Sequence, residues 1–181
     1  MINSISYITS NPGKAKHMSR LLGYNVEVVS IVIPEIQSLD LQEVISHKTS
    51  TAYNLLKKPL FLDDVSLVIS AMNRLPGPLI KFFIQELGSE KICDIVNLFN
   101  SRDAIAQAII GYHDGKNMHF FKGEVRGQIA LKPSGKKGFG WDNIFIPQGY
   151  SKVRAEMTDY EYDQTSPRAI AFNQLKAFLQ H

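Results

Sequence analysis

A short segment near the N-terminus combines the residue types that bind phosphate. Its residues are Thr9, Ser10, Asn11, Pro12, Gly13 and Lys14. A strand-like run from Ser4 to Thr9 precedes the turn, and a helix is expected from Lys14 to Leu22 with Gly23 as its stop. A strand, a glycine-containing turn and a helix in that order present backbone N–H groups to an anion. The spacing is not that of a Walker loop, so both a phosphate-binding loop and a plain tight connection fit the pattern.

Three acidic residues have the chemistry to bind a divalent cation. Asp63 and Asp64 follow the apolar residues Leu60 to Leu62, which predicts a strand that ends in two acids. Successive strand residues point to opposite faces, so the two carboxylates are expected to have different roles. Glu35 follows another strand-like run and a proline, and we expect it near the same cleft. Carboxylates together with phosphate and water oxygens suit Mg²⁺. The alternative is a solvated pair of acids in a turn.

The segment from Gly138 to Asp142 combines glycine, aromatic and acidic residues. Its glycines allow the backbone to approach a ligand closely. The rings of Phe139 and Trp141 can stack on a base, and Asp142 can accept a hydrogen bond from a ring N–H. The segment therefore fits a base-binding site, and it also fits an aromatic corner of the core.

Two basic residues stand out by their positions. Lys48 lies on the apolar stripe of a helix predicted over Leu41 to Lys57. Its stem either snorkels along the helix edge or carries an ammonium into a cleft. Arg168 follows Ser166 and Pro167 near the start of a C-terminal helix. It can fork onto carbonyl or phosphate oxygens, or it is simply a surface arginine.

The elements that must position these residues predict an α/β fold with a mixed sheet. Strands and helices alternate early, and a hairpin around Asp114 to Lys116 enters in the middle. Further strands are predicted over Val26 to Ile33, Leu67 to Ile69, Ala104 to Tyr112, Met118 to Leu131 and Ile144 to Ile146. Further helices are predicted over Pro78 to Leu87 and Glu90 to Phe99.

The bulk properties limit the class of protein. The 181 residues suit one domain, 1–181, and a hydrophobic fraction of 44% supports a sizeable core. The single cysteine, Cys93, excludes an internal disulfide framework; we expect it to be a core thiol in a reducing compartment. No signal peptide or membrane-spanning run is apparent, which predicts a cytoplasmic protein that does not bind membranes. The net charge of +3 is too mild to demand nucleic acid.

Taken in order, the motifs resemble the inosine triphosphate pyrophosphatase family. The matching segments are Thr9–Lys14, Pro34–Gln37, Leu62–Asp64, Leu75–Lys81, Gly138–Pro147 and Ala155–Met157, followed by Ser166 and Arg168. The resemblance implies a long twisted mixed β-sheet flanked by helices, two lobes with a central cleft, and a homodimer. It also implies Mg²⁺-dependent hydrolysis of non-canonical purine nucleoside triphosphates such as ITP, dITP and XTP to the monophosphate and pyrophosphate.

The resemblance further assigns roles to residues. Asp64 and Lys14 are catalytic: Asp64 orients or deprotonates the attacking water, and Lys14 holds phosphate. Glu35 and Asp64 bind Mg²⁺, and Arg168 reaches the 6-keto oxygen of the base. The residues placed against the substrate are Thr9, Ser10, Asn11, Pro12, Gly13, Lys14, Lys48, Val65, Lys81, Phe139, Gly140, Trp141, Asp142, Tyr162, Ser166, Pro167 and Arg168.

The chain departs from the family pattern at three positions, two of which alter the base-reading half of the site. The family usually has serine or threonine where this chain has Val65. It usually reads Lys-Asn and then Ser-His-Arg, where this chain has Tyr162-Asp163 and Ser166-Pro167-Arg168. Because polar partners of the substrate carry its discrimination, a pyrophosphatase with shifted or relaxed base preference is expected. The competing hypotheses are a catalytically weak nucleotide-binding protein of the same fold and a nucleic-acid-binding module.

Overall fold

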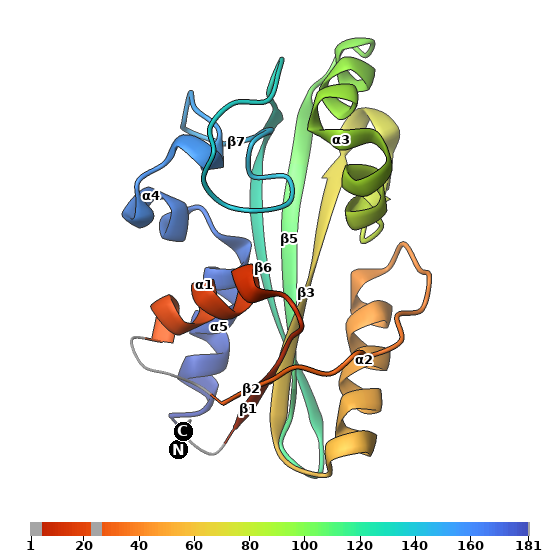
Figure 1. Cartoon of the computed structure of the whole chain (residues 1–181), viewed down its shortest axis with the longest axis vertical. Coiled ribbons are helices and arrows are strands. Elements are labelled where there is room, and N and C mark those ends of the chain that lie inside the picture. Colours follow the sequence, from red (N-terminus) through yellow and green to blue (C-terminus); the bar gives the residue numbers. More distant parts are fainter. Residues whose placement is uncertain (1–4, 23–26, 181) are drawn as a thin grey trace.

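The computed structural model describes residues 5–22 and 27–180, which form helices around one twisted sheet (Figure 1). Seven strands make up the sheet in these residues, in the order β2-β1-β3-β5-β6-β7, with β4 paired to β3. The strands are β1 (Ser6–Ile8), β2 (Val28–Val29), β3 (Leu60–Ile69), β4 (Pro76–Gly77), β5 (Asp103–His113), β6 (Met118–Ile129) and β7 (Phe145–Pro147). Only β1 pairs in parallel, with β2 and β3, so the predicted mixed sheet is confirmed.

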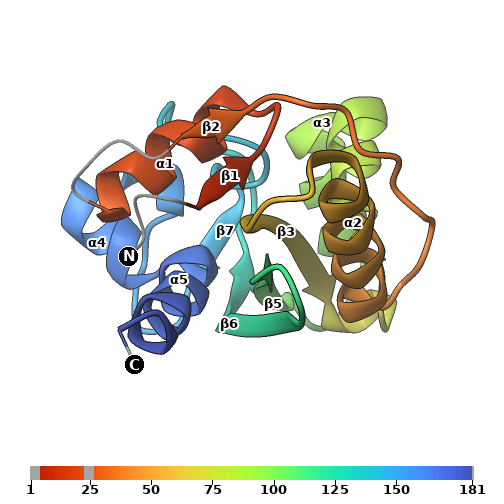
Figure 2. The ribbon, with the colours of Figure 1, turned by 90° about the horizontal axis from the view of Figure 1, so that it is seen from below.

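Helices cover the sheet on both sides. The α-helices are α1 (Pro12–Leu22), α2 (Leu41–Leu56), α3 (Ile80–Asn97), α4 (Asp159–Gln164) and α5 (Pro167–Phe178), with short 3₁₀ turns η2 (Ser70–Met72) and η3 (Arg154–Glu156). Seen from below in Figure 2, α1, α4 and α5 lie on one side of the strands, and α2 and α3 lie on the other. No helix among the described residues has the length and apolar character needed to cross a membrane.

The core is divided along β3. Phe61 packs with Phe172 of α5, whereas its neighbour Leu62 joins Ile45 of α2 on the opposite face. Leu67, further along the strand, belongs to a third cluster with α3. The expected core thiol, Cys93, lies in that third cluster. The polar residues of β3 therefore lie between the apolar cluster that includes α3 and the two clusters that include α2 and α5.

The prediction that a strand ends at Asp63 and Asp64 was wrong. β3 is ten residues long and runs on to Ile69, because its antiparallel ladder with β5 is unbroken from Leu60 to that point. The second extended piece, predicted from Leu67, is the continuation of the same strand. The two acids point to opposite faces, as predicted: Asp63 contacts α5 and Asp64 contacts α2.

Several element boundaries also differ from prediction. α1 begins at Pro12 rather than Lys14, because proline suits a first helical turn. β2 covers only Val28–Val29; residues 30–33 leave the ladder, and residues 31–33 line a cleft. The predicted limits at Ser4, Gly23 and Val26 lie outside the described residues. The two helices predicted from Pro78 and Glu90 are the two halves of α3, which is kinked where Gly88 has a φ of 74°.

Helix α4 was not predicted. A capping box begins it: the Thr158 hydroxyl accepts the N–H of Glu161, and the Glu161 carboxylate accepts the N–H of Thr158. The sequence Thr-Asp-Tyr-Glu carries that signal. The six-residue helix lacks the apolar periodicity by which longer helices are recognised.

Candidate active site

One cleft of about 440 Å³ is lined by most of the residues that were predicted to form the site. It is lined by residues from the phosphate-type loop, β3, α2, α3, the segment after β6, and the start of α5. The predicted residues along it are Thr9, Ser10, Asn11, Lys14, Glu35, Lys48, Asp64, Val65, Lys81, Phe139, Gly140, Trp141, Asp142, Tyr162, Ser166, Pro167 and Arg168. Pro12 and Gly13 are the two predicted residues that do not line it.

The loop before α1 is organised by Asn11. Its side-chain oxygen accepts hydrogen bonds from the backbone of Gly13 at 2.8 Å and of Lys14 at 3.2 Å, which caps the helix. Only the amide nitrogen of Asn11 is left to donate to a ligand. Gly13 has a packing role, because a Cβ there would lie 3.0 Å from the ring of Phe139. The loop and the aromatic segment are therefore in direct contact.

Lys14 is held by the buried acid Asp63. Its ammonium donates to the Asp63 carbonyl at 3.0 Å and lies 3.2 Å from the carboxylate. The same carboxylate accepts from the Tyr7 hydroxyl and, at 2.9 Å, from Arg168. Burial alone would raise the pKa of Asp63, but the adjacent Arg168 and Lys14 hold it well below its usual range. Asp63 is thus the permanent counter-ion of two cleft cations.

Asp64 takes part in a second, separate arrangement of charges. The Lys48 ammonium lies 2.9 Å from Asp64 and 2.7 Å from Glu35. Burial lowers the pKa of Lys48, but the two carboxylates outweigh that effect and raise it. The side chain of Lys48 is only 12% exposed, and its ammonium lies in the cleft between two acids. The other Asp64 oxygen accepts the N–H of Val65 at 2.8 Å.

The donor set at Glu35 and Asp64 fits a magnesium ion that also binds substrate. The two carboxylates already share one cation, the Lys48 ammonium, so they converge on one point. Among the described residues no group of three or more His, Cys, Asp or Glu side chains is placed to hold a metal alone. Mg²⁺ prefers six oxygens and commonly takes one or two carboxylates together with phosphates and waters. Two converging acids beside a phosphate-type loop meet that requirement.

The end of the cleft that was predicted to bind the base is built around Asp142. One of its oxygens accepts from Arg154 at 2.8 Å, and the other accepts from the Tyr162 hydroxyl at 2.7 Å and the Phe139 N–H at 2.9 Å. Burial, reinforced by the charge of Asp142, raises the pKa of Tyr162 to about 12, so this hydroxyl remains a donor. Trp141 lines the cleft and also packs edge-on against Phe145 in the core. The segment from Gly138 to Asp142 therefore contributes both to the cleft and to the core.

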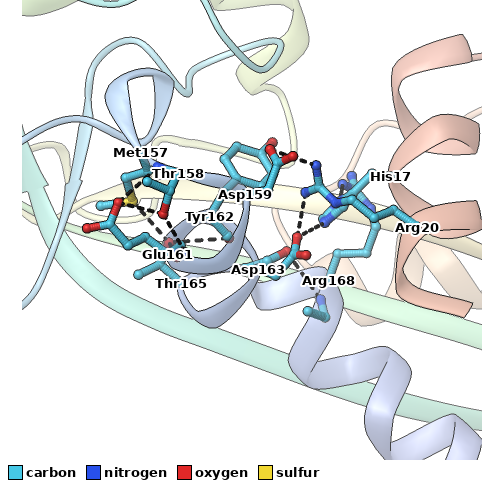
Figure 3. A network of polar contacts seen from close by, with 12 residues as sticks. His17, Arg20, Met157, Thr158, Asp159, Glu161, Tyr162, Asp163, Thr165 and Arg168 are labelled. Carbon is cyan, nitrogen blue, oxygen red and sulfur yellow. Dashed lines mark hydrogen bonds and ion pairs between the residues drawn. The ribbon is translucent and has the colours of Figure 1, made fainter. Parts of the chain in front are cut away.

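Arg168 lines the cleft from α5, and its Nε and Nη1 both have hydrogen-bond partners; Figure 3 shows it near His17, Arg20 and Asp163. Besides Asp63, it contacts Nδ1 of His17 at 3.2 Å, and its guanidinium lies 5.3 Å from the centre of the Phe139 ring. The other His17 nitrogen lies 3.0 Å from Asp163, which also pairs with Arg20 at 2.5 Å. Burial and the nearby Arg168 lower the pKa of His17 to about 4. His17 is therefore neutral at pH 7 and donates to Asp163.

The remaining predicted residues have simpler positions. Ser166 caps α5 by accepting the N–H of Ala169 at 3.2 Å, and Pro167 occupies the first helical position. Lys81 lines the cleft from α3, whereas Lys48 lines it from α2.

Arg154 and His17 were not predicted to belong to the site. Both are buried and contact predicted site residues: Arg154 contacts Asp142, and His17 contacts Arg168. Arg154 stands beside the Ala155–Met157 motif, which was the only available signal. The family-type lysine and histidine are absent from positions 162 and 167. The structure nevertheless places Arg154 beside Tyr162, and His17 beside Arg168, the residue that follows Pro167.

Comparison with known proteins agrees with this arrangement. The model of the Ham1 family matches residues 5–178. An inosine triphosphate pyrophosphatase of Schizosaccharomyces pombe is 35% identical over 99% of this chain and 97% of its own length. A dITP/XTP pyrophosphatase of Thermococcus kodakarensis is 34% identical over 97% of both chains. The solved Ham1 protein of Staphylococcus aureus superposes with a TM-score of 0.78 at 25% identity, covering 97% of this chain and 98% of that one.

Proposed function

Since the chain belongs to the Ham1 family, we propose that it hydrolyses non-canonical purine nucleoside triphosphates such as ITP, dITP and XTP to the monophosphate and pyrophosphate. It is a nucleoside-triphosphate pyrophosphatase, a hydrolase of the phosphoanhydride bond. The observation that carries the proposal is the convergence of Glu35 and Asp64 on one cation in the cleft that also holds the loop of Asn11 and Lys14.

The triphosphate chain fits the cationic end of the cleft. Lys14 and Lys48 come from the helices on either side of β3, and Lys81 comes from α3. All three would lie along the phosphates, where ammonium groups offset the charge of the substrate. The amide nitrogen of Asn11 and the loop around it would add hydrogen bonds to phosphate oxygens.

The hydrolytic step needs an oriented water and a stabilised leaving group. Asp64 would accept a proton from the water while the water oxygen bonds to the α-phosphorus. The bond from that phosphorus to the oxygen that bridges it to the β-phosphorus would break, which releases pyrophosphate. Glu35 and Asp64 would hold Mg²⁺, which when bound neutralises charge on the phosphate oxygens. Lys48, which donates to both acids, would then exchange these carboxylate partners for phosphate, because Mg²⁺ would take its place between them.

The base preference is proposed to be relaxed relative to the family. Asp142 already accepts from Arg154, Tyr162 and Phe139, so little of its accepting capacity remains for a ring N–H. Pro167 offers no side-chain polar atom. Arg168 would remain the contact to the 6-keto oxygen, and Phe139 and Trp141 would flank the ring.

A second candidate is a nucleotide-binding protein of the same fold with weak catalysis. It is favoured by one observation: Lys48 forms an ion pair with each of the two proposed metal ligands, so a metal must compete with an internal cation. Nucleotide that binds in the presence of Mg²⁺ but is never hydrolysed would decide for this candidate.

A substrate panel tests the proposal. Pyrophosphate release is followed from ITP, XTP, dITP and the four common NTPs, each with Mg²⁺ and with EDTA. We expect Mg²⁺-dependent release with only a modest preference for ITP over GTP. Absence of release from every nucleotide would remove the enzymatic function, whereas a large ITP preference would remove only the relaxed specificity.

Two further proposals concern the state of the protein. We expect a homodimer, which size-exclusion chromatography with light scattering tests directly; a monomer at micromolar concentration would contradict it. We also expect a cytoplasmic protein that does not depend on nucleic acid. A salt titration of RNA and DNA binding checks the latter, since binding to phosphates weakens steeply with salt.

A further inference from the structure

Arg154 is a buried arginine whose contacts join three segments of the chain. It is 2% exposed, and its Nε donates to Asp142 at 2.8 Å. Its Nη1 donates to the carbonyl of Tyr162 at 3.2 Å and to the hydroxyl of Thr165 at 2.9 Å. A buried guanidinium is costly unless its charge and its N–H groups are matched. Arg154 meets that condition by tying η3 to α4 and to the segment after β6.

The partner of Arg154 shapes the aromatic segment. The Asp142 oxygen that Arg154 does not contact accepts the backbone N–H of Phe139. Gly138 has a φ of 83°, and a Cβ there would collide with the Asp142 carboxylate. The backbone before Phe139 is thus wound around this carboxylate, in a conformation that glycine adopts without strain.

The aromatic segment in turn meets the phosphate loop. The Phe139 ring lies against Gly13 and beneath the guanidinium of Arg168. A shift of Asp142 would therefore move the ring that separates the base end of the cleft from the loop. The described contacts of Arg154 include neither Lys14, Lys48 nor Asp64, so Arg154 acts on the rest of the site only through Asp142 and the aromatic segment.

We propose that Arg154 is a positioning residue that determines base specificity: it fixes Asp142, and through Asp142 it sets where Phe139 and Trp141 stand at the base end of the cleft. The inference rests on the proposed function for its substrate and on the contacts of Arg154 for its mechanism. It predicts that Arg154 governs nucleotide affinity and base discrimination and leaves the chemical step nearly unchanged.

The test is Arg154→Met, which keeps a long side chain and removes the charge. With ITP we expect KM to rise about tenfold and kcat to stay within about twofold, the pattern of lost binding shared by ground state and transition state. The ratio of kcat/KM for ITP over GTP should also change. Trp141 is the only tryptophan and is 8% exposed, so its emission should shift to longer wavelength when the segment loosens.

Matched variants separate positioning from general loss of structure. Arg126→Met removes an exposed arginine on β6 outside the cleft and should leave KM and emission unchanged. Arg154→Lys retains the buried charge but not the fork, and we expect about a threefold rise in KM; it replaces Arg154→Met if the latter does not fold. Circular dichroism and thermal melting establish which variants are folded.

The outcomes distinguish this inference from the proposed function. Unchanged KM, base ratio and Trp141 emission in the folded variant would overturn the role of Arg154. A kcat that falls while KM stays constant would also overturn it. If the unmodified protein releases no pyrophosphate, the proposed function fails; Trp141 emission, with and without added ITP, still decides whether Arg154 positions the segment.

Discussion

The two ends of the cleft are built on different principles. At the proposed triphosphate end, Lys48 bridges Glu35 and Asp64 in a partly exposed arrangement. At the proposed base end, Arg154 and Asp142 are buried and bonded on several sides. The first arrangement has charged groups that a ligand can reach, and the second is suited to holding a shape. Charge alone therefore does not mark a group as reactive; its exposure and the chance to exchange its partners matter as well.

The largest expected difference between the two arrangements lies at Asp64. Asp64→Asn should lower kcat about a thousandfold, because a proton acceptor and metal ligand is lost from the reacting end. Lys48 keeps Glu35 as a partner, so the melting temperature should change little. Pyrophosphate release and thermal melting measure the two effects. Asp94→Asn on the exposed side of α3 is the matched control, and turnover retained in Asp64→Asn would remove Asp64 from catalysis.

Substitution of the neighbouring acid, Asp63, should reduce the stability of the fold strongly. Asp63→Asn leaves Arg168 and Lys14 without their shared counter-ion in a buried site. Such losses destabilise proteins by about 3 kcal/mol or more. Urea unfolding followed by Trp141 emission checks the value. A stability equal to that of Asp64→Asn would show that adjacent carboxylates of β3 are not functionally divided.

Acid should lower the stability of the folded protein through protonation of His17. Its folded pKa of about 4 lies below the ordinary 6.5, so the unfolded chain takes up the proton first. Stability is therefore complete above about pH 6.5 and is lost as the pH falls toward 4, by an amount of the order of 2–3 kcal/mol. Thermal melting between pH 7 and 4.5 measures it. His17→Gln should flatten the slope in this window, whereas the exposed His47→Gln should not; equal slopes would contradict the assignment.

The smallest expected effect concerns Glu35, the more exposed of the two proposed metal ligands. Glu35→Gln should raise the Mg²⁺ concentration that gives half-maximal rate by about tenfold, since one of two carboxylate ligands is lost. Asp64 and Lys48 remain paired, so folding should be unaffected. A magnesium titration at saturating ITP provides the measurement. An unchanged midpoint would place the metal elsewhere in the cleft.

The sequence allowed the directions of the two acids of β3 to be predicted, but not the buried contacts around them. The opposite directions of Asp63 and Asp64 follow from strand periodicity, which needs no knowledge of neighbours. The length of β3 could not be read, because it depends on a ladder with β5 about 45 residues away in the chain. Arg154 and His17 escaped for the same reason: their partners come from remote segments, and an isolated arginine or histidine carries no local signal.

We propose that the cleft hydrolyses a purine nucleoside triphosphate at the end that holds Glu35 and Asp64. The most direct measurement is the initial rate of pyrophosphate release from ITP by the unmodified protein, with Mg²⁺ and with EDTA, beside Asp64→Asn. We expect rapid release with Mg²⁺, none with EDTA, and about a thousandfold less from the variant. Release that is equal in the variant, or absent from the unmodified protein with Mg²⁺, would contradict it.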